Sequence, residues 1–336
     1  ANVSPTTYAT NLSNKLGHNV FLKREDLQPI FSFKCRGAYN KISSLSSIDT
    51  DKGIIAASAG NHAQGVALSA SKLRIDAMIV MPTTTPSIKI ESVKKFGVKV
   101  KLYGDSFDEA YEYALEVSNN EGRVFIHPFD DPLVIAGQGT VAKEIVEQSE
   151  EAPDIFFIPV GGGGLISGMS MYLKEHYPNI KVYGVESEDA PTLFTSLRNG
   201  KPTSLDQVGL FVDGCAVKRI GEETFKISKK YVDDVILVSI DETCAAIKDI
   251  YEDTRVMSEP AGALSIAGMK KFIASNNVKN KKIMAVNSGA NLNFDRLRHV
   301  TERAEIGEGK ELLISVKIPE ESGSFRKFCE VIGLSL

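Results

Sequence analysis

Short apolar runs alternate with amphipathic segments along most of this chain. The run at residues 53–57 is followed by a segment, from Asn61, whose apolar residues recur at the i, i+3, i+4 and i+7 spacing of a helix. This alternation is typical of βαβ units, in which helices join buried parallel strands. The pattern therefore predicts an α/β fold.

The same reasoning extends to two successive series of elements. The first series comprises strands at residues 53–57, 76–81, 98–103 and 124–126, with helices from residue 61 and at 86–96, 107–117 and 132–148. The second comprises strands at residues 154–160, 181–185, 235–239 and 282–286, with helices ending at 173 and at 242–254 and 261–274. Pro86 is expected at the first position of its helix. Two series predict two α/β lobes, each an open twisted sheet flanked by helices.

Ligands of such sheets bind outside the carboxyl ends of the strands. The loops that follow Ala57, Val160 and Val286 are therefore expected to converge on one crevice. These three loops hold most of the candidate chemistry.

Composition narrows the class of function. The 336 residues suffice for two domains, and a net charge of −4 gives no basic field for nucleic acid. No apolar run approaches the ~20 residues that span a bilayer, and no secretory signal opens the chain. We predict a soluble protein with small-molecule partners, without nucleic acid or membrane, and cytoplasmic unless a eukaryotic source places it in a plastid or mitochondrion.

The four cysteines lie far apart, and the five histidines include no pair with the spacing of metal ligands on a helix. We therefore predict no metal site and no disulfide framework, which favours a reducing compartment. Cys35 is interpreted as a small packing residue.

Lys34 lies between aromatic and small residues, in the sequence Phe31-Ser32-Phe33-Lys34-Cys35-Arg36-Gly37-Ala38. Ring walls lower the local dielectric constant, which disfavours an ammonium group and favours a neutral, nucleophilic amine. The alternative is an ordinary surface lysine in a loop. Lys34 is a candidate catalytic residue because two further loops supply matching chemistry.

The first of these loops, residues 58–65, joins a predicted strand to a helix N-terminus. Free backbone N–H groups and the helix dipole favour an anion there, and a substrate carboxylate would suit the site. The candidate substrate-binding residues are Ser58, Ala59, Gly60, Asn61 and His62. The competing interpretation is that Ser58 or Asn61 only caps the helix.

The second loop contains four consecutive glycines, Gly161, Gly162, Gly163 and Gly164, before Leu165. Glycines remove every side chain that could keep a phosphate from the backbone amides. No Gly-Lys-Ser/Thr follows, and the third glycine of the dinucleotide fingerprint is missing, so a monophosphate is expected. A tight packing turn is the weaker alternative, because one or two glycines would suffice for it.

Ser288 lies in the segment Asn287–Asn291, directly after the last apolar strand. Its position places a small hydroxyl at the mouth of the predicted crevice. A cap for the next helix is the competing interpretation.

A carboxylate site, a phosphate cradle and a reactive lysine together indicate pyridoxal 5'-phosphate acting on an amino acid, because that cofactor carries one phosphate and one aldehyde. From about Pro5 to its end the chain also resembles the threonine dehydratase (threonine deaminase) family. The motifs that carry this resemblance are residues 23–26, 32–34, 36–39, 58–65, 161–164, 259–263 and 288–291.

The resemblance implies the fold-type II architecture of pyridoxal-phosphate enzymes, similar to the β subunit of tryptophan synthase, with the cofactor between two lobes. It implies a large catalytic lobe at residues 1–36 and 141–306 and a small one at residues 37–140. The roles it assigns are covalent attachment of the cofactor and removal of the Cα proton for Lys34, the ring face for Phe33, the ring hydroxyl for Asn61, the phosphate for Gly161–Gly164 and Leu165, and the pyridine nitrogen for Ser288.

Residues 307–336 differ in character from the catalytic part. After a polar linker, residues 311–318 alternate as a strand and residues 323–332 predict a helix. They resemble the first βα unit of an ACT-like regulatory domain, in which isoleucine acts as an allosteric ligand of biosynthetic family members. One strand and one helix cannot bury a core alone. We expect a truncated or processed form, although a simple extension docked on the catalytic body is the alternative.

The resemblance implies dehydration and deamination of L-threonine, and also L-serine, to 2-oxobutanoate or pyruvate and ammonia, the first committed step of isoleucine biosynthesis. A homo-oligomer, dimer or tetramer, is expected. A serine racemase or serine dehydratase and a catalytically silent amino-acid sensor are the alternatives. Ala59 disfavours the racemase, because racemases of this group have a similar motif with serine at this position. The presence of Lys34 disfavours the sensor. The neutral hydroxyl of Ser288 cannot keep the pyridine nitrogen protonated, which favours β-elimination over transamination.

Overall fold

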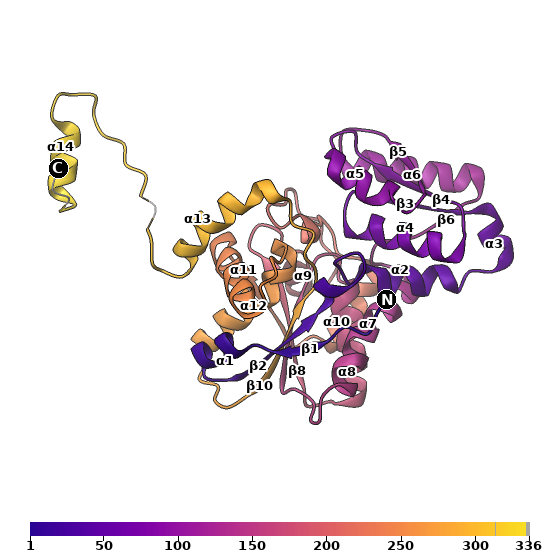
Figure 1. Cartoon of the computed structure of the whole chain (residues 1–336), viewed down its shortest axis with the longest axis horizontal. Helices are drawn as coiled ribbons and strands as arrows, with labels where there is room; N and C mark the ends of the chain where they lie inside the picture. Colours follow the sequence, from indigo (N-terminus) through magenta and orange to yellow (C-terminus); the bar gives the residue numbers. More distant parts are fainter. Residues whose placement is uncertain (313, 334–336) are drawn as a thin grey trace.

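The computed structural model describes residues 1–312 and 314–333, and their strands form two separate sheets (Figure 1). A six-stranded sheet has the order β1-β2-β10-β7-β8-β9, and a four-stranded sheet has the order β5-β4-β3-β6. Only the β1–β2 pair is antiparallel among these ladders. The predicted architecture of two α/β sheets is confirmed.

The large sheet contains β1 (Thr6–Tyr8), β2 (Asn19–Arg24), β7 (Ile155–Pro159), β8 (Lys181–Ser187), β9 (Asp234–Val238) and β10 (Lys282–Asn287). The small sheet contains β3 (Ile54–Ala57), β4 (Ala77–Met81), β5 (Lys99–Leu102) and β6 (Val124–Phe125). The sequence pattern missed β1 and β2. The charged residues Lys23 and Arg24 at the end of β2 do not resemble a buried strand, because charged residues are seldom fully buried. Lys23 is nevertheless 0% exposed.

Helices cover both sheets. They are α1 (Thr10–Leu16), α2 (Lys34–Ser43), α3 (Ser47–Lys52), α4 (Asn61–Leu73), α5 (Ser87–Lys94), α6 (Phe107–Glu121), α7 (Pro132–Glu147), α8 (Gly164–His176), α9 (Thr192–Asn199), α10 (Glu222–Tyr231), α11 (Ile240–Thr254), α12 (Pro260–Ser275), α13 (Leu297–Gly307) and α14 (Ser324–Val331). Short 3-10 helices lie at η1 (Glu25–Leu27), η2 (Asp213–Cys215) and η3 (Phe294–Arg296). Pro86 precedes α5 as its N-cap, so its predicted place at the first helical position is wrong by one residue. No helix within the described ranges is long and apolar enough to cross a membrane.

The core of the large lobe is built around α12. Its residues from Pro260 to Met269 are all buried, because this stretch is apolar or small on every side, as in helices enclosed by protein. Gly268 lets α12 approach the sheet, since a Cβ atom there would lie 2.4 Å from a methyl carbon of Val185. The packed helix fixes the end of the loop that leads into it, where Glu259 is the N-cap residue.

Helices α2 and α7 pack directly on each other where the chain passes between the two lobes. A Cβ atom on Gly137 would lie 2.6 Å from the Cα atom of Gly37, so both positions require glycine for this close approach. The Gly37 amide also donates to the side chain of Gln138. The predicted lobe boundaries at residues 37 and 141 fall inside these helices and stay predictions.

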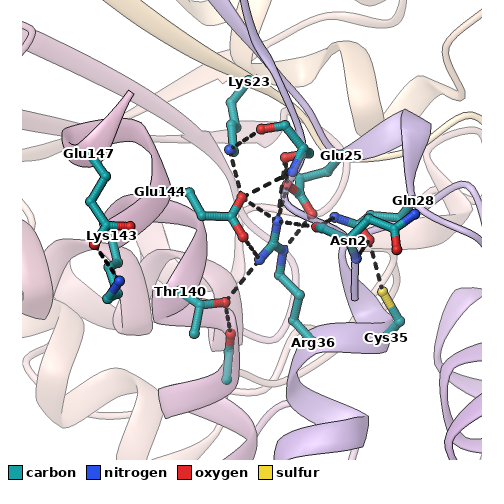
Figure 2. Close-up of polar contacts among 12 residues, drawn as sticks. Asn2, Lys23, Glu25, Gln28, Cys35, Arg36, Thr140, Lys143, Glu144 and Glu147 are labelled. Atoms are coloured by element: carbon teal, nitrogen blue, oxygen red, sulfur yellow. Dashed lines mark hydrogen bonds and ion pairs between the residues drawn. The ribbon is translucent and has the colours of Figure 1, made fainter. Parts of the chain in front are cut away.

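A buried network of charges braces the same junction (Figure 2). Arg36 pairs with Glu25 from η1 and with Glu144 from α7, using two nitrogen–oxygen contacts of 2.6 to 2.8 Å to each carboxylate. Lys23 from β2 donates to Glu144 at 2.8 Å and to the Ser4 carbonyl at 2.6 Å. Two cations and two carboxylates therefore balance within the protein, two residues from Lys34.

The C-terminal segment differs from its expected form. The predicted helix is present as α14, but the described residues of 311–318 form no strand, and residue 313 lies outside the described residues. A strand needs a partner for its backbone groups, and this segment runs away from the body in Figure 1. On α14, Phe325 is 58% exposed, so its apolar face is uncovered.

Candidate active site

Lys34 is the first residue of α2, and its amine points toward the segment after β6. The Nζ atom donates to the Pro128 carbonyl at 2.8 Å and lies 5.5 Å from the centroid of the Phe33 ring. Burial lowers the Lys34 pKa to about 8, although the nearby Cys215 and Glu259 act in the opposite direction. The expected shift toward a neutral amine is therefore present.

The segment before Lys34 is tied to the loop after β10. Ser32 and Gly289 form an isolated antiparallel bridge, and the Ala290 amide donates to the Phe31 carbonyl at 2.9 Å. Phe31 is 53% exposed and adopts a φ of 54°, in the left-handed region that bulky residues rarely enter. Of the two rings beside Lys34 in the sequence, Phe31 is thus exposed to solvent, and Phe33 lies near the Lys34 amine.

Ser288 lies in this joined region and is buried. Its hydroxyl donates to the Ala261 carbonyl at 3.3 Å, and its own carbonyl accepts the Phe33 amide at the same distance. No helix begins at Ser288, because η3 starts at Phe294 with Asn293 as its N-cap. The interpretation of Ser288 as a helix cap is therefore wrong.

Asn61 opens α4 from the small lobe. Its amide nitrogen donates to Glu259 Oε1 at 2.7 Å, and its amide oxygen accepts from Asn291 Nδ2 at 2.6 Å. The N-cap of α4 is Gly60, without a capping side chain, and Ser58 Oγ accepts the Gly60 amide instead of an amide of the helix. The capping interpretations of Ser58 and Asn61 are therefore wrong, and the first turn of α4 offers backbone N–H groups to an anion.

His62 follows Asn61 but its ring is buried beneath the loop. Its Nε2 atom lies 2.9 Å from the Ile126 carbonyl, so this nitrogen carries the proton. Burial and the nearby Lys34 lower the His62 pKa to about 3. The imidazole is neutral, and any carboxylate on the loop from Ser58 to His62 would meet backbone amides instead of a cationic ring.

The glycine loop joins β7 to α8. Gly163 is the N-cap of α8 with a φ of 90°, and no side chain caps this helix. A Cβ atom on Gly162 would lie 2.2 Å from the Phe129 ring, and one on Gly163 would lie 2.8 Å from the Thr224 side chain. Gly161 and Gly164 are confined similarly, at 3.0 Å from Cys215 and 3.1 Å from Phe129.

These contacts change the interpretation of the loop. We expected a packing turn to need one or two glycines, but packing constrains all four positions. The number of glycines therefore does not by itself indicate a phosphate. What supports an anion site is the free N-terminus of a helix of 13 residues beside the wall that contacts Lys34.

Residues 127–129 form this wall, and their sequence pattern had predicted no role for them. Pro128 accepts the Lys34 amine, and Phe129 covers the glycine loop. His127 Nδ1 accepts the amides of Phe129 and Asp130, so the proton lies on Nε2, and burial lowers its pKa to about 4. The position of these residues directly after β6 could have revealed them, because the carboxyl ends of parallel strands share one edge.

The structure thus brings three predicted loops together. Asn61 contacts Asn291 from the loop after β10, that loop pairs with the segment before Lys34, and Lys34 contacts the wall over Gly161–Gly164. An amine with a lowered pKa, such as that of Lys34, can add to a carbonyl group, and uncapped helix ends can hold anions. The roles of individual residues stay predictions.

Comparison with known proteins adds an independent finding. A family model described as "Pyridoxal-phosphate dependent enzyme" matches residues 2–289. The chain is 54% identical over 333 residues to the biosynthetic L-threonine dehydratase of Pasteurella multocida, covering 99% of this chain and 65% of that protein. It is 52% identical to the mitochondrial threonine dehydratase of Saccharomyces cerevisiae, covering 98% of this chain and 58% of the relative. The chain thus spans less than two thirds of each relative.

Solved structures agree with this similarity. The processed form of threonine deaminase isoform 2 from Solanum lycopersicum superposes with a TM-score of 0.89 at 49% identity, covering 90% of this chain and 88% of that one. Maize serine racemase superposes with a TM-score of 0.84 at 32% identity, covering 92% and 94%. The same fold therefore accommodates proteins named for two different reactions.

Proposed function

We propose that this chain, which belongs to the pyridoxal-phosphate-dependent enzyme family, is the catalytic part of a biosynthetic threonine dehydratase. The proposed reaction converts L-threonine to 2-oxobutanoate and ammonia, and L-serine to pyruvate and ammonia. The observation that carries the proposal is the half-buried Lys34, whose pKa is lowered to about 8 where three loops converge. Similarity to threonine dehydratases along 99% of the chain supports the choice of substrate.

The residues present fit the cofactor. Lys34 supplies an amine for its aldehyde, and the N-terminus of α8 at Gly161–Gly164 supplies backbone N–H groups for its phosphate. Ser288 supplies a neutral hydroxyl, whose single hydrogen would turn from the Ala261 carbonyl to the ring nitrogen. Leu165 lies in the first turn of α8, where its amide is available to the phosphate. When bound, the cofactor supplies a ring that withdraws electrons from the substrate Cα atom.

The protein's own groups then perform the remaining tasks. The backbone amides after Ser58 hold the substrate carboxylate at the uncapped start of α4. The neutral amine of Lys34 accepts the Cα proton, because a group with a pKa near the working pH can both take and release a proton. His62 and His127 stay neutral and add no positive charge that would compete with Lys34.

The test is a direct assay with the cofactor-loaded chain. L-threonine and L-serine should yield keto acid, measured by reduction with a dehydrogenase, and Lys34→Ala should abolish turnover. Lys143→Ala is the matched control, since Lys143 is an exposed lysine on α7 that pairs with Glu147. Full dehydratase activity in the Lys34→Ala variant would overturn the proposal.

Serine racemisation is the competing reaction, because serine racemases share this fold. Ala59 carries no hydroxyl where the racemase motif has a serine, and the Ser58 hydroxyl of the same loop already accepts the Gly60 amide. We therefore infer that reprotonation from the face opposite Lys34 is negligible. Chiral analysis of the remaining L-serine decides between them. D-serine that forms as fast as pyruvate would favour the racemase.

We also propose that isoleucine regulates the complete protein and that the enzyme is a dimer or tetramer. Support for regulation comes from the resemblance of residues 307–336 to the first βα unit of an ACT-like domain, of which the helix is present as α14. Measurement of molar mass by light scattering tests the oligomer. The cytoplasmic location likewise stays a prediction.

A further inference from the structure

Two side chains from distant parts of the chain, Asn291 and Glu259, determine the direction of the Asn61 amide. Asn291 Nδ2 donates to the Ile30 carbonyl at 2.8 Å, and this backbone oxygen can only accept a hydrogen bond. The orientation of the Asn291 amide is therefore fixed. Its second N–H points at Asn61, at 2.6 Å.

The atom of Asn61 that faces this second N–H must be its oxygen. The amide nitrogen of Asn61 consequently lies at the other end, where Glu259 Oε1 accepts one of its two hydrogens at 2.7 Å. An asparagine amide has two N–H donors. One N–H of Asn61 therefore remains for a ligand, and contacts at both ends of the amide fix its side-chain torsions.

Glu259 is itself held in a position suited to this contact. It is the N-cap residue of α12 and is 4% exposed, and its backbone amide donates to the Gly289 carbonyl. A Cβ atom on Gly289 would lie 2.4 Å from Glu259 Oε1, so glycine at this position makes room for the carboxylate. Burial and the nearby Asp213 raise the Glu259 pKa to about 7.

A buried carboxylate is costly unless its contacts compensate for lost hydration. Glu259 makes no ion pair shorter than 4.0 Å within the described ranges, which distinguishes it from Glu25 and Glu144. Its hydrogen-bonding partner there is the Asn61 side-chain amide, and the Asn291 backbone amide lies near enough to lower the Glu259 pKa against the effect of burial. The Glu259 carboxylate is thus positioned to accept the hydrogen bond from Asn61.

We propose that Glu259 is a positioning residue, which orients Asn61 so that the remaining N–H faces the ring oxygen of pyridoxal phosphate. A rotated amide would present its own oxygen to that ring oxygen, and the two acceptors would repel. The inference rests on the proposed function and on the contact of Asn61 with the cofactor's ring hydroxyl that the family resemblance implies. It assigns to the carboxylate a role that acts only through Asn61.

The test compares two ligands, pyridoxal phosphate and its analogue in which hydrogen replaces the ring hydroxyl. Their dissociation constants are measured by absorbance titration of the apo-protein. Glu259→Ala should weaken binding of pyridoxal phosphate about three- to tenfold, the range of one net hydrogen bond, and leave the analogue unchanged. In an Asn61→Ala background, Glu259→Ala should have no further effect on either ligand.

Two controls separate positioning from folding. Glu259→Gln retains an acceptor for Asn61, so the preference for pyridoxal phosphate over the analogue should persist. Glu186→Gln changes another buried glutamate, which accepts from Thr192 and from two backbone amides of α9. It should alter binding of both ligands equally or not at all.

The outcomes distinguish the inference from the function beneath it. Equal weakening of both ligands by Glu259→Ala, or additive effects with Asn61→Ala, would overturn the positioning role while the enzyme remains a dehydratase. If Glu259→Ala fails to fold, Glu259→Gln replaces it, and loss of the ligand preference in that variant would overturn the positioning role as well. Failure of the unaltered chain to bind pyridoxal phosphate would instead overturn the proposed function.

Discussion

The lowered pKa of Lys34 predicts a measurable pH dependence of cofactor capture. Burial shifts this pKa from 10.5 to about 8. At pH 7 the neutral amine is then about one molecule in eleven, compared with about one in 3,000 for an unshifted lysine, a difference of roughly 300-fold. Because the fraction of neutral Lys34 amine rises with pH, the rate of cofactor capture should rise through a midpoint near pH 8 and then level off.

The assay follows addition of the amine to the aldehyde of pyridoxal phosphate. Apo-protein is mixed with the cofactor at pH values from 6 to 11, reduced with borohydride after a fixed short time, and the labelled peptides are quantified by mass spectrometry. Lys143 is the internal reference, since its pairing with Glu147 raises its pKa above the ordinary value. Its labelling should begin only at much higher pH.

A second variant checks the sign of the electrostatic contribution. The Glu259 carboxylate raises the Lys34 pKa, against the larger effect of burial. Glu259→Gln removes this negative charge, so the midpoint for Lys34 should move below 8. A midpoint near 10.5 in the unaltered chain, or equal labelling of Lys34 and Lys143, would refute the reasoning from burial.

Three further predictions concern the glycine loop, the buried network and regulation. Gly162→Val should raise the dissociation constant of pyridoxal phosphate more than about tenfold, even when Phe129→Ala makes room; recovery of affinity in the double variant would show a packing turn only. Arg36→Met should lower the free energy of unfolding by about 3–5 kcal/mol in urea titration, because it strands buried carboxylates. Lys143→Ala, which breaks an exposed pair, should lower the free energy of unfolding much less, and equal losses would contradict the argument. Isoleucine should leave the rate of keto-acid production by this chain unchanged, and clear inhibition would place an effector site in the catalytic body.

The periodic parts of the fold could be predicted from the sequence, and the exceptions share one physical cause. Strands such as β7 and β10 are apolar runs whose burial is a local property of the sequence. The strand β2 contains Lys23, whose burial depends on its pairing with Glu144, a residue 121 positions away in the chain. The expected strand at residues 311–318 has the right alternation but no partner among the described residues. Patterns report local periodicity, whereas pairing requires knowledge of the neighbours.

The candidate site shows the same division. Lys34 and the glycine loop could be found because their residue types are unusual for their positions. Pro128 accepts a hydrogen bond from Lys34 through its backbone carbonyl. Every residue has such a carbonyl, so the sequence cannot identify the one that takes part. Glu259 was visible within its motif, but its contact with Asn61 joins residues 198 positions apart. Side chains that act through another residue are recognised only from geometry.

The buried network explains how a reactive lysine can lie where two lobes meet. Lys34 begins the helix that carries Arg36, and Arg36 is fixed to Glu25 on one side and to Glu144 on the other. Because each carboxylate receives two contacts from the planar guanidinium group, rotation or sliding of α2 would break several bonds at once. The lysine backbone is therefore held to η1 on one side and to α7 on the other, although its amine has no carboxylate partner among the ion pairs of the described residues. The paired charges of Arg36, two residues away, restrain the start of α2. The Lys34 amine therefore needs no ion pair of its own, which would keep it protonated.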